Sequence, residues 1–176
     1  TLEQLRELKL VGMAQAYQAL LSLSSDQHPD AHTLLAQLAQ MESQQRQDQR
    51  TQTLLRLSKL RYSASLEQIK CSVQRNLRRE QISALADCNF ITRAENVLIT
   101  GPTGSGKSYL ACALGHQACL MGHKTWYVNM AHFVERLMLA RLNGTYLKEM
   151  AKIERVSVVI LDDFGLHPLS ADTRLA

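Results

Sequence analysis

An eight-residue stretch, Gly101-Pro102-Thr103-Gly104-Ser105-Gly106-Lys107-Ser108, restricts the fold of this chain more strongly than any other part of it. It fits the phosphate-binding pattern G-x-x-x-x-G-K-[ST] at every fixed position. The apolar run 96–100 before it predicts a short buried strand, and the residues from Ser108 onward have the spacing of a helix. A strand, a glycine-rich loop and a helix in this order form the context of a P-loop. The stretch therefore predicts a nucleotide-binding site rather than a glycine-rich turn before a core helix.

Each part of this loop has a chemical role in the predicted site. Glycines let the backbone approach a phosphate closely and point successive N–H groups at its oxygens. Lys107 supplies a positive charge for the β and γ phosphates, and the Ser108 hydroxyl is a hard oxygen ligand suited to Mg²⁺. The predicted nucleotide-binding residues are Gly101, Pro102, Thr103, Gly104, Ser105, Gly106, Lys107, Ser108 and Tyr109. The predicted cofactors are ATP and Mg²⁺, and Lys107 is also a predicted catalytic residue.

A second motif, Val158-Val159-Ile160-Leu161-Asp162-Asp163, places four apolar residues before two carboxylates. It matches a Walker B pattern, which predicts a parallel strand buried on both faces with its carboxyl end near the ligand. Asp162 is predicted to hold magnesium together with Ser108, directly or through water. Asp163 is the predicted catalytic residue that polarises the attacking water, although most related motifs have the longer Glu at that position. The alternative is a strand followed by an acidic turn.

Composition sets the outer limits of the fold class. The chain has 176 residues, of which 45% are hydrophobic and 20% charged, so it has enough apolar material for a globular core. It contains neither an apolar stretch long enough to cross a bilayer nor a signal-peptide pattern at its start. We therefore expect a cytoplasmic protein without a membrane partner.

The sequence pattern divides the chain into three parts. Residues 1–65 have apolar positions at helical spacing and predict a small all-α N-terminal domain, with a turn at 24–29 and a helix beginning after Asp30. Residues 66–93 are predicted to form a basic linker and helix, and residues 94–176 a nucleotide-binding domain. In that last part, elements are predicted in alternation as a strand at 96–100, a helix from 108, a strand at 124–128, a helix at 130–142 and a strand at 158–161. The predicted fold class is thus an α/β P-loop NTPase with a parallel sheet.

Positive charge is concentrated between residues 44 and 79. This segment has nine cationic side chains and two carboxylates, a net charge of +7, whereas the whole chain is only +4. A local concentration of this kind is typical of contact with a phosphate backbone, with a solvated helix face as the alternative. We predict double-stranded DNA as a partner, and we assign the contacts to Arg75, Arg78 and Arg79.

Three stretches resemble one family, the IstB-like helper ATPases of insertion-sequence transposition, which are related to the DnaC-type helicase loaders in the AAA+ class. They are Leu8-Lys9-Leu10-Val11-Gly12-Met13, the segment Arg93-Ala94-Glu95-Asn96 continuing to Ser108, and Leu161-Asp162-Asp163-Phe164-Gly165-Leu166-His167-Pro168-Leu169-Ser170. The last stretch discriminates best, because a double aspartate followed by Phe-Gly-Leu and Pro-Leu is similar to this family rather than to P-loop proteins at large. The resemblance covers most of the chain.

The resemblance implies an AAA+ type domain in an ATP-dependent, DNA-binding homo-oligomer that stimulates a partner transposase. It assigns nucleotide binding to Gly101–Ser108, magnesium binding to Asp162 and water activation to Asp163. A DnaC-like replicative helicase loader is the near alternative. A nucleotide-gated DNA or protein adaptor without catalysis is the alternative from a different functional class.

The sequence also departs from this family at its ends. It starts at Thr1 rather than Met and ends at Ala176, whereas family members continue with a further strand, a sensor residue and an arginine finger. From this difference we expect a C-terminally incomplete sheet, marginal folding, and ATP binding without efficient hydrolysis.

Overall fold

The computed structural model describes residues 1–24, 28–72 and 76–166. The chain divides into two compact units, Thr1–Thr53 and Leu54–Ala176. The first unit is helical in its described residues, as the sequence predicts, and the second contains the P-loop and both acidic motif residues. The long helix α3 (Ala31–Ser58) contributes residues to both units. No helix within the described ranges combines the length and the apolarity needed to cross a membrane.

The helical unit contains α1 (Leu2–Glu7), α2 (Val11–Leu21) and most of α3. Asp30 caps the N-terminus of α3 as predicted, because its Oδ1 accepts hydrogen bonds from the backbone N–H groups of His32 and Thr33 at 3.0 and 3.1 Å. The Thr33 hydroxyl also donates a hydrogen bond to the Asp30 carboxylate. This bond makes the largest contribution, and together with the two backbone bonds it holds the pKa of Asp30 below its ordinary value of 3.8. The predicted turn at 24–29 lies partly outside the described residues.

The helices α2 and α3 approach each other closely at Gly12. A Cβ on this glycine would lie 2.5 Å from the Met41 carbonyl oxygen and 2.7 Å from the Cα of Glu42, both of them backbone atoms. The Glu42 side chain is buried and accepts hydrogen bonds from the backbone N–H groups of Gly12, at 2.8 Å, and Met13, at 3.3 Å. Glu42 thereby satisfies N–H groups in the first turn of α2 that have no partner inside that helix.

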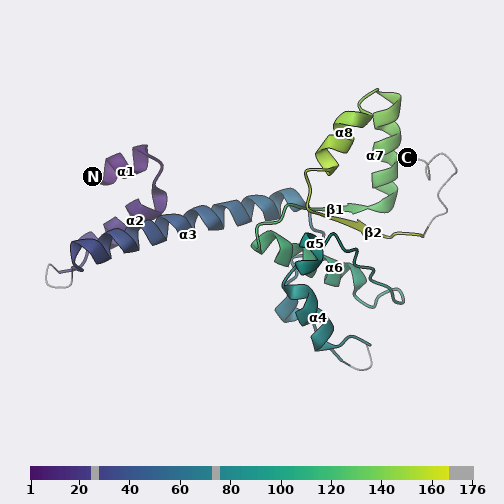
Figure 1. The fold of residues 1–176 in the computed structure, drawn as a ribbon, viewed down its shortest axis with the longest axis horizontal. Helices are drawn as coiled ribbons and strands as arrows, with labels where there is room; N and C mark the ends of the chain where they lie inside the picture. Colours follow the sequence, from purple (N-terminus) through teal and green to yellow (C-terminus); the bar gives the residue numbers. More distant parts are fainter. Residues whose placement is uncertain (25–27, 73–75, 167–176) are drawn as a thin grey trace. The chain divides into compact units, whose positions relative to one another are not determined.

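The second unit holds a two-stranded parallel sheet and several helices (Figure 1). The helical elements are η2 (Leu66–Gln68), α4 (Arg79–Ala86), α5 (Asn89–Thr92), α6 (Lys107–Leu120), α7 (Met130–Leu142) and α8 (Tyr146–Ile153). The strands are β1 (Thr125–Asn129) and β2 (Val158–Asp162). Tyr127 pairs with Ile160, and Asn129 pairs with Asp162. The parallel pairing of these two strands and the helix at 130–142 are confirmed.

Two expectations about the sheet are wrong. Residues 96–100 form no strand and are not buried, since Leu98 is 79% exposed and Val97 39% exposed. An extended segment becomes a strand only when a neighbouring chain pairs with its N–H and C=O groups, and neither β1 nor β2 does so here. The strand β2 is half-buried at all five positions instead of buried on both faces. The described part of the chain is therefore mostly helical, with a small parallel sheet.

Helix α6 packs directly against this sheet. A Cβ on Gly115 would lie 2.7 Å from Ile160 Cδ1 and 3.3 Å from Thr125 Cγ2, so the glycine permits close contact with both strands. Cys112, Ala113, Ala118 and Cys119 on the same helix are fully buried. The half-buried ring of Tyr127 packs against the cluster that includes Cys112 and Ala113. This packing brings the start of α6 next to the carboxyl end of β2.

Candidate nucleotide-binding site

The loop before α6 has the backbone that its glycines allow. Gly104 and Gly106 have φ angles of +79° and +90°, a region that residues with a Cβ seldom adopt, and Gly106 is the residue that precedes the helix. The helix begins at Lys107, so its first backbone N–H groups belong to the P-loop itself. Residues 101–104 are exposed, and residues 105–109 are half-buried. The loop thus presents an accessible backbone at the N-terminus of a helix, which favours an anion.

Lys107 bends back over the loop. Its Nζ donates a hydrogen bond to the backbone carbonyl of Pro102 at 3.0 Å. The ammonium group therefore lies on the loop that the sequence pattern assigns to phosphate binding. An entering phosphate can replace the carbonyl as its partner, because an ion pair with a phosphate oxygen is stronger than a bond to a neutral carbonyl.

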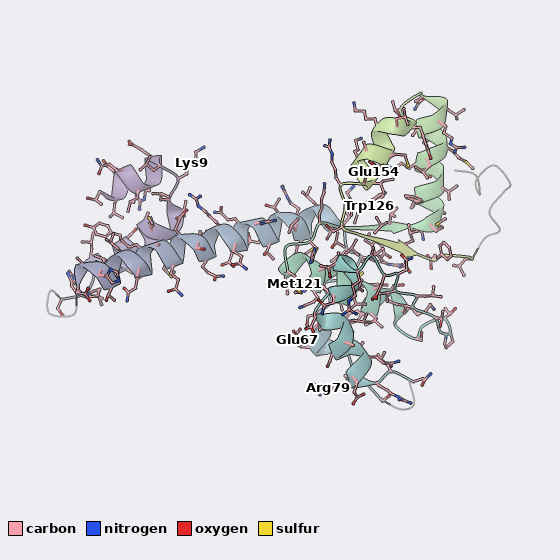
Figure 2. The ribbon with its side chains drawn as sticks, in the orientation of Figure 1. Lys9, Glu67, Arg79, Met121, Trp126 and Glu154 are labelled. Carbon is pink, nitrogen blue, oxygen red and sulfur yellow. The ribbon has the colours of Figure 1, made fainter. Side chains whose placement is uncertain are left out.

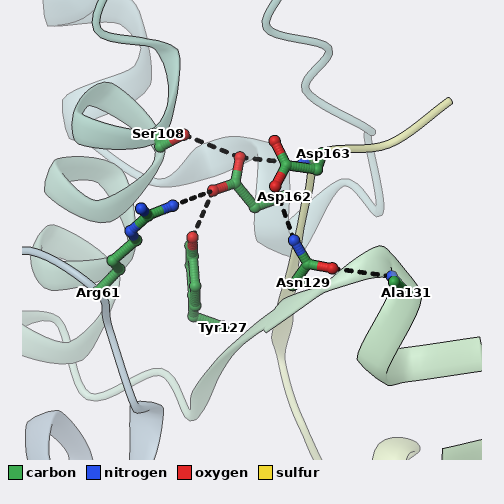
Figure 3. A network of polar contacts seen from close by, with 7 residues as sticks. All are labelled: Arg61, Ser108, Tyr127, Asn129, Ala131, Asp162 and Asp163. Atoms are coloured by element: carbon green, nitrogen blue, oxygen red, sulfur yellow. Dashed lines mark hydrogen bonds and ion pairs between the residues drawn. The ribbon is translucent and has the colours of Figure 1, made fainter. Parts of the chain in front are cut away.

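The P-loop and the acidic motif are joined by a direct contact. Ser108 Oγ donates a hydrogen bond to Asp162 Oδ1 at 2.9 Å, although 54 residues separate the two in sequence (Figure 3). Both oxygens are hard ligands of the kind that Mg²⁺ prefers. The described residues contain no group of three or more His, Cys, Asp or Glu side chains arranged around a metal position. A magnesium ion held by Ser108 and Asp162 would therefore take its other ligands from phosphate and water.

Asp162 has three further partners, which sequence patterns did not identify as a group. Its Oδ2 accepts a hydrogen bond from the Tyr127 hydroxyl and lies 3.9 Å from a guanidinium nitrogen of Arg61. Its Oδ1 accepts a second bond from the backbone N–H of Asp163 at 3.1 Å. Burial by itself raises the pKa of Asp162, but the hydrogen bonds from Tyr127 and Ser108 outweigh it and hold the pKa below the ordinary value of 3.8. The carboxylate is therefore ionised and ready to receive a cation at neutral pH.

Tyr127 keeps its proton in this arrangement. Burial, and then the neighbouring Asp162, raise the pKa of the Tyr127 hydroxyl well above its ordinary value of 10.0. The phenol therefore remains a donor to the carboxylate throughout the physiological range.

Asp163 is held by a different residue of β1. Its Oδ2 accepts a hydrogen bond from Asn129 Nδ2 at 2.7 Å, and its backbone is left-handed with φ +57° (Figure 3). Asn129 Oδ1 in turn accepts a bond from the Ala131 backbone N–H at 2.9 Å and so caps α7. Tyr127 and Asn129 alternate along one strand and therefore project from the same face of the sheet. The spacing of two residues between Tyr127 and Asn129 is therefore a sequence signal from which both could be identified as neighbours of the acidic motif.

The predicted DNA-contacting arginines lie elsewhere in the second unit. Arg78 precedes α4, and Arg79 begins that helix (Arg79 is labelled in Figure 2). Both side chains are exposed. They line a cavity of about 630 Å³ together with Lys70, Glu67 and Glu80. Arg75 lies outside the described residues.

Comparison with known proteins identifies relatives along almost the whole chain. The family model of the IstB-like ATP binding protein matches residues 3–175. A protein of Pseudomonas fluorescens named as an ATP-binding protein of insertion sequence IS1162 is 37% identical over 175 residues, which is 99% of this chain and 76% of that relative. An insertion sequence ATP-binding protein of Sinorhizobium fredii, y4pL, is 35% identical over 99% of this chain and 71% of its own length.

A more distant relative agrees with these two. The insertion sequence IS5376 ATP-binding protein of Geobacillus stearothermophilus is 31% identical over 96% of this chain and 68% of its own length. This family implies a P-loop NTPase fold and a nucleotide ligand, in agreement with the loop described above. The chain therefore belongs to the IstB-like family of insertion-sequence ATP-binding proteins.

Proposed function

We propose that this protein is an ATP-binding, DNA-binding helper of insertion-sequence transposition that assists a partner transposase in handling target DNA. The contact between Ser108 and Asp162 is the observation that carries the nucleotide part of this proposal. It joins the end of the P-loop to the end of β2, so that a phosphate on the loop and a metal on the carboxylate would lie next to each other. The insertion-sequence part is supported by the names of the relatives.

Magnesium-ATP would be held by residues with separate tasks. The backbone N–H groups at the start of α6 and the ammonium of Lys107 would bind the phosphates, after Lys107 leaves the Pro102 carbonyl. Ser108 and Asp162 would hold the magnesium ion, which neutralises phosphate charge when bound. Tyr109 follows the loop and donates a hydrogen bond through its hydroxyl to Gln68 at 2.7 Å, so it would stiffen the beginning of α6.

Hydrolysis by this chain is proposed to be slow. A residue that activates water must accept a proton from it within hydrogen-bonding distance. Asp163 has a shorter side chain than the Glu usual at this position, and one of its oxygens already accepts a bond from Asn129. That arrangement favours a protein that binds ATP and signals its presence, with a nucleotide-gated adaptor as the second candidate function.

DNA binding is proposed for the basic segment, with Arg78 and Arg79 as phosphate contacts. Both guanidinium groups are exposed at the start of α4. We also propose that the protein forms a homo-oligomer and that it binds a partner transposase. Replacing Arg78 and Arg79 together by Ala is expected to weaken DNA binding similarly for all sequences and to reduce the salt dependence, because phosphate contacts release counterions. An unchanged salt slope would argue against this assignment.

The nucleotide part is tested by thermal unfolding of the full chain with and without magnesium-ATP. A ligand at a hundred times its dissociation constant stabilises the folded state by about 2.7 kcal/mol, which raises the midpoint by about 5 to 10 °C for a chain of this size. Lys107→Ala should abolish the rise, whereas Lys148→Ala on the exposed surface of α8 should retain it. A rise of equal size in Lys107→Ala would show that the nucleotide binds elsewhere.

A further inference from the structure

The Tyr127 hydroxyl reaches Asp162 from a neighbouring strand and not from the P-loop. Tyr127 lies on β1 opposite Ile160 of β2, two positions before Asp162. Its ring packs against the cluster that contains Ala64, Cys112 and Ala113, while its hydroxyl donates to Asp162 Oδ2 (Figure 3). A ring fixed in this way leaves the hydroxyl little freedom to turn aside.

The partners of Asp162 are divided between its two oxygens. Oδ2 receives the Tyr127 hydroxyl and the guanidinium of Arg61, whereas Oδ1 receives the Ser108 hydroxyl at 2.9 Å and the backbone N–H of Asp163 at 3.1 Å. The side chain of Arg61 is 56% exposed and its nitrogen is 3.9 Å away, so it fixes the carboxylate only weakly. The bond from Tyr127 is partly buried, and it is charge-assisted because its acceptor is a carboxylate. Tyr127 is thus the main group that holds Oδ2, and it fixes the rotation of the carboxylate together with the two donors on Oδ1.

We infer that Tyr127 is a positioning residue for the metal-nucleotide site: by holding Oδ2 of Asp162, it turns Oδ1 toward Ser108. The two oxygens proposed to share the cation are thereby set side by side before any ligand arrives. Preorganisation of this kind raises affinity because the carboxylate does not have to be ordered during binding. Without the hydroxyl, Oδ2 keeps only the weak contact with Arg61, and the bonds to Oδ1 from Ser108 and the Asp163 N–H hold the carboxylate less firmly.

The inference rests on the proposed binding of magnesium-ATP, and it concerns only the part of the affinity that depends on magnesium. Tyr127→Phe removes one oxygen and leaves the packed ring. Affinity for a nucleotide in the presence of EDTA should stay as in the wild type, because the loop and Lys107 are unaltered. The enhancement of that affinity by Mg²⁺ should fall about threefold to tenfold, the size expected when one charge-assisted hydrogen bond no longer orders a ligand.

The experiment titrates a fluorescent ATP analogue into the full chain, once with EDTA and once with saturating Mg²⁺, and compares the ratio of the two dissociation constants. Both values come from one preparation, so a reduced folded fraction leaves the ratio unchanged. Tyr17→Phe in the helical unit is the matched control and should keep the wild-type ratio. In an Asp162→Ala background, Tyr127→Phe should have no further effect, because Tyr127 acts through that carboxylate.

Two results would overturn the inference while leaving the nucleotide site intact. One is a wild-type ratio in Tyr127→Phe, whether both affinities are unchanged or both are weakened equally. The other is an additional loss in the Asp162→Ala background. A wild-type chain that binds no analogue, or that binds it without any effect of Mg²⁺, would instead overturn the proposed function and this inference with it.

Discussion

At the scale of single residues, the side chain of Asn129 has two separate hydrogen-bonding roles. Its amide nitrogen donates to Asp163, and its amide oxygen caps α7 through the Ala131 N–H. Asp162 on the neighbouring strand is bound by Tyr127 from the same face of β1. Both carboxylates of the acidic motif are therefore held by side chains of one strand, Asp162 by Tyr127 and Asp163 by Asn129.

Asn129→Ser separates the two tasks of this residue. A serine oxygen still serves as a helix cap, but its shorter side chain no longer reaches Asp163. We expect ATP turnover to rise about twofold to fivefold, because the released carboxylate can accept a proton from water. Phosphate release at saturating magnesium-ATP measures the effect, with Asn143→Ser at the other end of α7 as the control. Lower turnover in Asn129→Ser would show that the amide holds Asp163 in its working position.

At the scale of elements, close packing depends on glycine at two positions, Gly12 and Gly115. In both cases the atoms around the glycine explain why a residue with a Cβ would not fit. At Gly115 the nearest atoms belong to side chains of Ile160, Leu60 and Thr125, which have some freedom to shift. At Gly12 the nearest atoms belong to the backbone of α3, which cannot move without moving the helix. Gly12 lies in the Leu8–Met13 stretch that carries the family resemblance. Its close packing against α3 explains why that stretch contains a glycine.

Gly12→Ala is expected to loosen the contact between α2 and α3. Overpacking costs about 1 to 3 kcal/mol, and separation of the helices also lengthens the hydrogen bonds that the Gly12 and Met13 N–H groups donate to Glu42. Hydrogen exchange of the α2 amides should accelerate about tenfold or more, since 1.4 kcal/mol corresponds to a factor of ten. Gln15→Ala on the exposed side of α2 is the control. Unchanged exchange in Gly12→Ala would mean that α3 adjusts without cost.

At the scale of the whole molecule, several carboxyl groups respond to acid in the same direction. The pKa values of Asp30, Glu42, Glu149 and Asp162 all lie below their ordinary values. For Glu149 the cause is first the hydrogen bond from Lys152 and then the one from Arg136. Such groups bind protons more readily in the unfolded chain, so their contribution to stability is present above the ordinary pKa and disappears as the pH falls through the folded pKa.

The free energy of unfolding should therefore decrease below about pH 4.5 and receive a constant contribution from these four groups above about pH 5.5. Chemical denaturation at a series of pH values measures this dependence. Glu42→Gln should reduce the loss of unfolding free energy that occurs in the helical unit as the pH falls. The amide oxygen of Gln accepts the same backbone hydrogen bonds, but the amide does not titrate between these pH values. Stability that increases on acidification would contradict the assignment.

Elements with local signals can be predicted from the amino-acid sequence alone. Asp30 marks the start of α3, the residues 130–142 match α7, and the apolar residues before Asp162 form β2. The fixed spacing of its glycines and Lys107 likewise predicts the P-loop. The helix α6 begins at Lys107, as this pattern requires. Side-chain periodicity and capping act within a few residues, so a linear pattern is sufficient to predict them.

Which segments pair and which side chains meet depends on contacts between distant parts of the chain, and these become visible in the folded structure. The apolar run 96–100 has the composition of a strand, but a strand also needs a partner, and no described strand pairs with it. The convergence of Arg61, Ser108 and Tyr127 on Asp162 depends on the register of β1 with β2 and on the packing of α6 against both. These contacts join residues far apart in the chain, and their geometry is fixed by the packed fold rather than by any local pattern.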